Sequence, residues 1–567
     1  MSAGFRNAAI VALAAVLCVA APWARSQEVN RPSAGAPIPS LYEDSAVFTT
    51  AIAAEGHTDG FEQPVTGLIL PHHLLAADLI ARGVQAASRH AYRRVIVMAP
   101  DHFNRSRRPF ATTTRDVATV FGTLGTDRAA VATLLRVPDL FEESGLFDRE
   151  HGVAALLPFI KRLLPGATIV PIANAITATR ADWDRAFDLL QPLLGPDTLV
   201  IQSTDFSHYL RPEIARQRDQ ESLNLLAAGD PEAASGLIQP DHIDSTAAFY
   251  LQLRLQASLG SHPVVIANRN SDTYSPGADR TTSYIVAAFT REPAKVPAFP
   301  DQTIAYVGGD FFAGRLLTAP LASAAQREAV VRQVLAVTGG APLILNLEGA
   351  ILDEIPSNVP SDLHAMDATL ALPLLRALHA SAAGLANNHS FDLGAPGLAS
   401  SERALAGAGI KPLPQGRIAD FGPFRMVTLN YVGQGGGRKG YPVVRSGDIE
   451  SLCRSAAKPP LLAFVHWGRE FTATAEAPER SEAEALATCG VSAVIGAHSH
   501  TASTRIDAPD GGQLMSVYSL GNFLFDQRSP RGTGALLELR FFKQGTFASR
   551  LIPLPNFFEQ VADSRNR

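Results

Sequence analysis

The sequence predicts two α/β domains in tandem, and three observations support this. Short apolar segments with the length of buried strands alternate with segments of helical periodicity through both halves of the chain. Strands that are apolar along almost their whole length are typical of sheets covered by helices on both faces. Three prolines within 292–301 indicate an extended linker, which divides the 567 residues into two parts of domain size.

We expect six segments: a signal peptide over 1–26, a flexible lead-in over 27–41, a first domain over 42–291, the linker over 292–301, a second domain over 302–556 and a tail over 557–567. Arg6 precedes 14 apolar residues, and Ala24-Arg25-Ser26 has the small-x-small pattern of a cleavage site. That stretch is shorter than the roughly 20 residues that span a bilayer. We therefore expect export to the periplasm or outside the cell, with no transmembrane span after cleavage. The alternative is an uncleaved N-terminal anchor.

The composition excludes several classes of protein. With 49 Lys+Arg against 54 Asp+Glu the net charge is −5, and no basic run supplies the positive face of a nucleic-acid binder. A hydrophobic content of 46% excludes a mainly disordered chain. With only three cysteines, a metal site has to be built from His, Asp, Glu and Asn. Cys453 and Cys489 each precede a strand, and geometry decides whether they pair.

Three histidines follow three predicted strands of the first half. The strands expected here are 65–70, 95–99, 168–172 and 198–202, with one amphipathic helix over 151–164. Because the carboxyl ends of such strands meet in one crevice, His72, His102 and His208 are expected to converge there. With Asp101 and Asp205 as oxygen donors they would hold one cation, Fe, Zn or Cu. The alternative is that each histidine caps its own loop.

Five ordered motifs of the first half carry a family resemblance. They are Pro71-His72, Ala99-Pro100-Asp101-His102, Phe121-Gly122-Thr123-Leu124-Gly125-Thr126-Asp127, Glu150-His151 with Leu157-Pro158-Phe159, and Ser203-Thr204-Asp205-Phe206-Ser207-His208-Tyr209. This half resembles the Memo proteins (AmmeMemoRadiSam system protein B), which are related in fold to class III extradiol dioxygenases. The resemblance implies that His72, His102 and His208 occupy the metal-site positions, with His151 and Asp205 lining the cleft. The cysteine that the family carries is absent, and Ile243-Asp244-Ser245-Thr246-Ala247 stands in its place.

Each predicted strand of the second half is followed at once by a metal-binding residue type. The strands expected are 304–307, 343–345, 382–385, 461–465 and 493–495, and the candidate ligands after them are Asp310, Glu348, Asn388, His466, His498 and His500. Two divalent cations, Mn, Zn or Fe, take mixed nitrogen and oxygen ligands with a bridging carboxylate. His389 would protonate a leaving group as general acid. The alternative is that these residues only form turns.

A second resemblance rests on motifs over 302–545. They are Gly309-Asp310 with Arg315, Asn346-Leu347-Glu348, Asn387-Asn388-His389 with Asp392 and Gly394, His466-Trp467-Gly468-Arg469-Glu470, Gly496-Ala497-His498-Ser499-His500, and Tyr518-Ser519-Leu520-Gly521-Asn522-Phe523. They resemble the CapA family of capsule and poly-gamma-glutamate biosynthesis proteins. The resemblance implies a domain similar to calcineurin-like metallophosphoesterases, an α-β-β-α sandwich, and we expect Arg315 to bind a substrate anion.

These observations predict an exported metal-dependent hydrolase of the CapA type with a Memo-like metal-binding module. Its substrate would be an anionic small molecule or an envelope polymer, in capsule, poly-gamma-glutamate or cell-envelope metabolism, and its partners would be components of an envelope synthase. Two alternatives stay open. One is a non-enzymatic accessory that binds metal or polymer and assists envelope synthesis. The other is oxidative chemistry at a non-heme iron in the first half.

Overall fold

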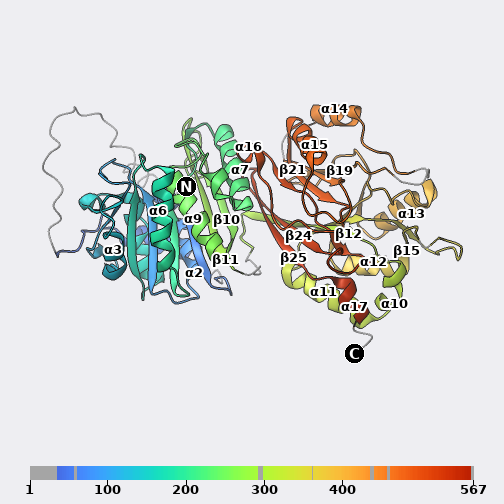
Figure 1. Cartoon of the computed structure of the whole chain (residues 1–567), viewed down its shortest axis with the longest axis horizontal. Coiled ribbons are helices and arrows are strands. Elements are labelled where there is room, and N and C mark those ends of the chain that lie inside the picture. The colour runs from blue at the N-terminus through green and yellow to red at the C-terminus, as the bar shows by residue number, and fades with distance from the viewer. Residues whose placement is uncertain are drawn as a thin grey trace, which may run out of the picture.

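The computed structural model describes residues 35–55, 60–291, 298–360, 362–433, 440–455 and 460–563. The expected signal peptide, the first part of the lead-in and residues 292–297 of the linker lie outside these ranges. Figure 1 shows two lobes that follow the chain, the first in blue and green and the second in yellow to red. Within the described residues, no helix combines the length and the apolar character needed to cross a membrane.

The first lobe contains one large mixed sheet with the strand order β10-β11-β1-β8-β2-β7-β3-β6, and β9 pairs with β11. Its strands, together with the separate β4–β5 hairpin, are β1 (Val65–Leu70), β2 (Arg94–Pro100), β3 (Phe110–Thr112), β4 (Val117–Thr119), β5 (Gly122–Leu124), β6 (Phe141–Glu143), β7 (Thr168–Asn174), β8 (Thr198–Ser203), β9 (His208–Leu210), β10 (His262–Asn270) and β11 (Thr281–Thr290). The neighbours β1, β8, β2 and β7 are parallel, so their carboxyl ends lie at one edge. All four strands expected from the sequence are present.

Helices cover both faces of this sheet. They are α1 (Ser45–Ala54), α2 (Ala77–Ala87), α3 (Arg128–Leu134), α4 (His151–Ala154), α5 (Leu157–Leu163), α6 (Arg180–Leu190), α7 (Pro212–Ala228), α8 (Pro231–Ala234) and α9 (Thr246–Ser258). The single helix expected over 151–164 is divided into α4 and α5. Pro158 lies in the first turn of α5, where its missing N–H leaves no hydrogen bond unmade.

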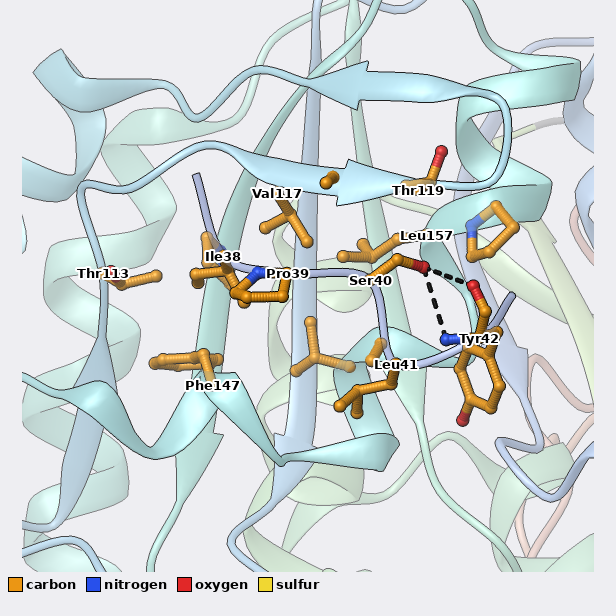
Figure 2. Close-up of a pocket in the computed structure, with 15 residues that line it drawn as sticks. Ile38, Pro39, Ser40, Leu41, Tyr42, Thr113, Val117, Thr119, Phe147 and Leu157 are labelled. Atoms are coloured by element: carbon orange, nitrogen blue, oxygen red, sulfur yellow. Dashed lines mark hydrogen bonds between the residues drawn. The ribbon is translucent and has the colours of Figure 1, made fainter. Parts of the chain in front are cut away.

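The described end of the expected lead-in, residues 35–41, packs against the first domain. Ile38 is buried and pairs with β4: its N–H donates to the Asp116 carbonyl at 2.7 Å, and its own carbonyl accepts from Ala118 N–H at 2.8 Å. Figure 2 shows Ile38 to Ser40 running alongside β4 of the β4–β5 hairpin. The hollow that these residues line encloses about 10 Å³. That is room for one water molecule at most, so it is not a substrate site.

The second lobe has two packed sheets, with strand orders β17-β16-β13-β12-β24-β25 and β18-β19-β20-β21-β22; β23 pairs with β12. Its strands, including the small β14–β15 pair, are β12 (Gln302–Phe311), β13 (Leu343–Leu347), β14 (Ala350–Leu352), β15 (Ala365–Asp367), β16 (Ala380–Gly384), β17 (Lys411–Leu413), β18 (Ala419–Asp420), β19 (Arg425–Asn430), β20 (Leu461–His466), β21 (Val491–Ala497), β22 (Met515–Val517), β23 (Asn522–Leu524), β24 (Gly534–Phe542) and β25 (Phe547–Leu554). Apolar side chains such as Val307 and Ile344 from one sheet meet Phe464 and Ile495 from the other. This is the central layer of the expected sandwich.

The outer layers of the second lobe are helical. The helices are α10 (Thr318–Leu321), α11 (Ala324–Thr338), α12 (Ala368–Ala377), α13 (Gly394–Gly407), α14 (Ser446–Ser455), α15 (Ala477–Thr488), α16 (Pro509–Gly512) and α17 (Phe557–Asp563). Cys453 of α14 and Cys489, which caps α15, form a disulfide. The expected tail begins with α17, in which Phe557 and Val561 are buried. The α/β class and the α-β-β-α arrangement predicted from the sequence are therefore confirmed.

The two domains share a packed interface, where α7 lies against α16 and β25 (Figure 1). The Asn224 side chain donates to the Gly512 carbonyl at 2.7 Å, and the Gln220 side chain donates to the Phe547 carbonyl at 2.9 Å. The second-domain residue Phe542 belongs to an apolar cluster of the first domain. Direct hydrogen bonds and shared apolar packing therefore hold the two domains together.

Candidate functional site

The first candidate centre lies at the carboxyl edge of β1, β8 and β2. The Nδ1 atom of His102 lies 2.6 Å from Oε1 of the fully buried Glu150, and Nδ1 of His72 lies 3.3 Å from Oγ of Ser203. Both imidazoles therefore turn Nε2 toward Asp244, whose Oδ2 lies 3.2 Å from His72 Nε2 and 4.0 Å from His102 Nε2. A histidine whose second nitrogen is held by a carboxylate is typical of metal ligation.

Electrostatics of this centre also suit a cation. Burial alone would lower the pKa of His72, but the Asp205 and Asp244 carboxylates outweigh it and raise this pKa to about 9. Burial and the adjacent His102 and His72 rings lower the pKa of His151 to about 4. Carboxylates thus create a site that favours positive charge. A cation bound by His72, His102 and Asp244 would take the place of the proton on His72 Nε2.

The other expected residues of the first half take different positions. His151 lies beside His102, with 4.0 Å between ring centroids. Asp205 accepts from the His72 N–H at 3.1 Å, and its other oxygen lies 3.7 Å from His72 Nε2. Asp101 accepts from three backbone N–H groups of the next loop, so it shapes that loop. His208, in β9, joins none of the groups of potential ligand atoms among the described residues.

Sequence reasoning missed two residues of this centre. Asp244 reaches this centre because Ile243 pairs with Phe206, and this pairing brings the start of α9 beside the end of β8. Its position was visible in the sequence, as the place of the missing family cysteine. Glu150, which orients His102, was recognised only as part of a motif. The feature of the sequence that could have pointed to Glu150 is its position directly before His151.

The second candidate centre is built around two buried carboxylates, Asp310 and Glu348. The ring of His500 lies between them, with Nδ1 3.5 Å from Asp310 Oδ2 and Nε2 3.8 Å from Glu348 Oε1. Asn346 donates to Asp310 at 2.7 Å. Neither oxygen of Glu348 has a hydrogen-bond donor among the described residues, although the side chain is fully buried. A buried carboxylate without a donor is costly unless a cation neutralises it.

The remaining expected ligands gather at the same edge. His466 Nε2 lies 2.7 Å from the Asn388 side-chain oxygen, and the His466 and His498 rings are 4.7 Å apart. The backbone N–H of His498 donates to Asp310 at 3.2 Å, while its Nδ1 is buried without a partner in the described part of the chain. The structure thus brings together all six predicted ligands of the second half.

The turn after β21 places both of its histidines in unusual backbone conformations. His498 has φ 89° and His500 has φ 57°, in the left-handed region that residues other than glycine seldom adopt. Such conformations persist where the surroundings impose them, often at functional sites. In this turn the backbone N–H of His498 donates to Asp310, while the His500 ring lies between Asp310 and Glu348.

Burial sets the protonation of this centre. Burial, together with the neighbouring His500, lowers the pKa of His498 to about 3, and burial lowers the pKa of His466 well below its usual value. Burial and the adjacent Asp310 carboxylate raise the pKa of Glu348 well above its usual value. Neutral imidazoles beside two crowded carboxylates provide the mixed nitrogen and oxygen donors that suit a pair of divalent cations.

The proposed general acid, His389, is fixed by two neighbours. Its Nδ1 lies 2.8 Å from Oδ2 of Asp392, which leaves Nε2 directed toward Glu348 at 3.8 Å. The His364 ring stacks on His389 with centroids 3.7 Å apart and an interplanar angle of 17°. Sequence reasoning missed His364 because it lies before the short strand β15, not after a strand of a large sheet.

Arg315, which we expect to bind a substrate anion, contacts three neighbouring side chains. Its guanidinium forms two hydrogen bonds with Asp526, and its Nη1 lies 3.0 Å from His364 Nε2. The guanidinium carbon also lies 4.8 Å from the centroid of Phe312. These contacts already engage Arg315 within the protein. The geometry therefore favours a positioning role toward His364 over direct binding of a substrate anion.

Two known families match this chain, one in each of its two domains. Residues 47–286 match Memo-like proteins, and residues 303–420 and 439–527 match the bacterial capsule synthesis protein PGA_cap. A MEMO1 family protein of Caldivirga maquilingensis is 27% identical over 183 residues, which cover 30% of this chain and 62% of that protein. The PGA biosynthesis protein CapA of Bacillus subtilis is 26% identical over 213 residues, which cover 34% of this chain and 55% of that protein. The chain thus spans less than two thirds of each of these relatives.

Proposed function

The first half of the chain belongs to the Memo-like family and the second half to the PGA_cap family, and we propose that the second half is a two-metal hydrolase of the cell envelope. One observation carries the proposal: the buried Glu348 carboxylate lies without a hydrogen-bond donor among the described residues. It belongs to two groups of potential ligand atoms, one with Asp310 and His500 and one with His364 and His389. A carboxylate in that position suits a bridge between two cations. Asp310 and His500 would complete one site. Asn388, His466 and His498, which gather beside Asp310, would form the other.

The chemistry follows from the positions of these side chains. Divalent cations, when bound, polarise an ester or phosphoryl oxygen and lower the pKa of a bound water. His389 would donate a proton from Nε2 to the departing oxygen, because Asp392 holds its Nδ1. His364 and Phe312 form a stacked row beside His389, which fixes the plane of the acid. Orientation of this kind is worth large factors in rate.

We infer the substrate class from the relatives and from the donor set. The Bacillus subtilis relative is named a PGA biosynthesis protein. Cations at the second centre would attract an anionic substrate, so a phosphoester or an acidic envelope polymer fits this site. Export of the chain belongs to the same proposal. The disulfide between Cys453 and Cys489 supports it, because disulfides persist mainly in oxidising compartments.

The test combines metal analysis with turnover of bis(p-nitrophenyl) phosphate, a generic phosphodiester. We expect the full-length protein to bind Mn²⁺ at the second centre and to hydrolyse this ester. The His389→Ala variant should keep its metal and lose between about 100-fold and 10,000-fold in kcat. Full metal occupancy without hydrolysis of this ester or of acidic envelope polymers would favour the non-enzymatic accessory instead.

A second function is favoured for the first half by a specific observation. The imidazoles of His72 and His102 both point Nε2 at the carboxylate of Asp244. Two histidines and one carboxylate are the ligand set typical of non-heme Fe(II) centres. We propose that this half binds one such cation. Loss of first-domain iron in a His72→Ala, His102→Ala double variant would support the assignment, and unchanged iron content would refute it.

A further inference from the structure

An exposed aromatic residue, Phe471, lies beside the second centre. It belongs to the turn that follows β20, and 41% of its surface is exposed. Its ring centroid lies 6.2 Å from that of the candidate ligand His500. Phe471 also has a positive φ, 63°, which is costly for a residue with a side chain. A strained backbone that presents an exposed ring next to a candidate ligand indicates a contact with substrate.

Hydrogen bonds hold this turn in place. The N–H of Phe471 donates to the carbonyl of Ser499 at 2.7 Å, and Ser499 stands between two of the candidate ligands. The N–H of Arg469 donates to the Tyr518 hydroxyl at 3.1 Å, and the Thr472 hydroxyl lies 2.9 Å from the same oxygen. The backbone therefore fixes the position of Phe471 relative to the second centre.

The guanidinium of Arg531 lies over the Phe471 ring, with its carbon 5.1 Å from the ring centroid. The loop that bears Arg531 is joined to the turn of the candidate ligands at two points. The Thr501 hydroxyl donates to the Arg531 carbonyl at 3.3 Å, and the Thr533 N–H donates to the His500 carbonyl at 3.2 Å. The Phe471 ring thus lies next to both a candidate metal ligand and a cationic side chain.

The charge of Arg531 is not neutralised within the described part of the chain. Two other arginines of this region, Arg315 and Arg469, already pair with Asp526 and Glu476. Among the described residues, no carboxylate forms an ion pair with Arg531 and no acceptor takes a hydrogen bond from its guanidinium. A guanidinium held on an aromatic face with its N–H groups free is suited to bind an oxyanion with two parallel hydrogen bonds.

We propose that Phe471 and Arg531 bind a second acidic group of the substrate, apart from the group that meets the cations. The inference rests on the proposed function of the second half, and it narrows the substrate to molecules with at least two acidic groups. Either a carboxylate or a phosphate matches the guanidinium. Glu470, exposed in the same turn, would repel such a group, so Arg531 is the side chain that receives it. The part of the substrate between its two acidic groups would pass along the Phe471 ring.

The test measures the binding of phosphonates, which are not hydrolysed, to the Mn²⁺-saturated full-length protein by isothermal titration calorimetry. Hexylphosphonate offers one acidic group. At a spacing of roughly 7 Å, the length of two extended residues, 6-phosphonohexanoate adds a carboxylate and hexane-1,6-diphosphonate adds a second phosphonate. We expect at least one of these two ligands to bind about tenfold more tightly than hexylphosphonate. The ligand with the larger gain identifies the acidic group that Arg531 receives.

Variants of the arginine test its role. Arg531→Gln should remove most of this preference, and Arg531→Glu should reverse it, because a carboxylate then faces the second acidic group. Phe471→Leu should reduce the preference, since the guanidinium loses the ring on which it lies. Arg528→Gln is the matched control: Arg528 lies in the same loop but pairs with Asp563, so this variant should keep the preference. Melting curves establish that each variant is folded.

Equal binding of the three phosphonates by the parent would overturn the proposal, and so would the absence of any phosphonate binding. An undiminished preference in folded Arg531→Gln or Arg531→Glu would also overturn it. The outcome is separable from that of the hydrolase proposal, because binding is read without turnover. A preference that depends on Arg531 in a protein that hydrolyses no ester would refute the hydrolase alone. Ester hydrolysis without such a preference would refute only the role of Phe471 and Arg531.

Discussion

The Nε2 atom of His72 lies 3.2 Å from Oδ2 of Asp244, although 171 residues lie between them in the chain. His102 approaches the same oxygen at 4.0 Å. In the Memo resemblance a cysteine is expected in this region, and here an aspartate occupies it. A carboxylate is a harder ligand than a thiolate, so the site is expected to prefer Fe(II) or Mn(II) over Cu(I).

Replacing Asp244 tests that relationship directly. Asp244→Ala should weaken first-domain iron binding, because His72 and His102 then lose the carboxylate that lies nearest to both. Asp244→Cys should shift the preference toward zinc and copper(I), since thiolates favour softer metals. Metal analysis after equilibration with equal concentrations of each metal measures both effects. Asp241→Asn, in the same loop, is the control and should retain iron; an Asp244→Ala protein with undiminished iron would disprove the ligand role.

Glu348 makes the stability of the second domain depend on metal. Without cations its buried carboxylate lacks a donor, so Glu348→Gln should raise the melting temperature in EDTA by roughly 2–4 °C, the equivalent of about 1 kcal/mol. With saturating Mn²⁺ the same variant should melt below the parent, because a bridging ligand is lost. Differential scanning calorimetry under both conditions measures the reversal. The same sign of change in both would contradict a metal-bridging role.

His364 should act on catalysis through its contact with His389. His364→Leu removes both the stacked ring and the acceptor for Arg315, while His364→Phe keeps the ring alone. We expect kcat to fall between about tenfold and 100-fold in the leucine variant and less in the phenylalanine variant. Metal content should stay unchanged in both. Equal losses in the two variants would show that stacking on His389 is not what matters.

The sequence predicted the parts of the site that follow strands of the main sheets. His72 and His102 stand just after apolar strands and Asp310 lies at the carboxyl end of one, and parallel pairing brings such strand ends to one edge of each sheet. Asp244 and His364 gave no such signal. Asp244 reaches the first centre through an isolated bridge, and His364 reaches the second through a small strand pair.

The roles of charged side chains were harder to predict than their positions. Arg315 follows β12 as a substrate-binding arginine would, yet Asp526, distant in sequence, engages its guanidinium. His208 follows β8 in the expected motif, but it pairs through β9 with β11. In both cases a long-range contact, which a local pattern does not encode, decides which way the side chain turns.

The disulfide should stabilise the second domain measurably. It closes a loop with a sequence separation of 36 between Cys453 and Cys489, for which chain-entropy arguments give about 3–4 kcal/mol. Dithiothreitol should therefore lower the free energy of unfolding of the parent by this order. The Cys453→Ser, Cys489→Ser double variant should start lower and not respond to dithiothreitol. A parent that is equally stable in its oxidised and reduced forms would rule out a stabilising disulfide.

The buried carboxyl group of Asp219 should make the stability of the protein depend on pH. It is fully buried on α7, accepts from Ser207 at 3.0 Å and from Asn268 and Gln544 at 3.2 Å, and so joins the two domains. Burial raises its pKa from 3.8 to about 6 despite these hydrogen bonds. Between these two values the folded chain holds more protons than the unfolded chain, so the contribution of Asp219 to stability falls as the pH rises.

The Asp219→Asn variant cannot titrate at this position, so its stability relative to the parent should increase between pH 4 and pH 7. The difference between 3.8 and about 6 corresponds to a change of about 3 kcal/mol. Urea unfolding of parent and variant at both pH values measures it. Asp188→Asn, on the exposed side of α6, is the control and should follow the parent. A variant whose advantage does not grow with pH would show that Asp219 is already ionised in the folded protein at pH 4.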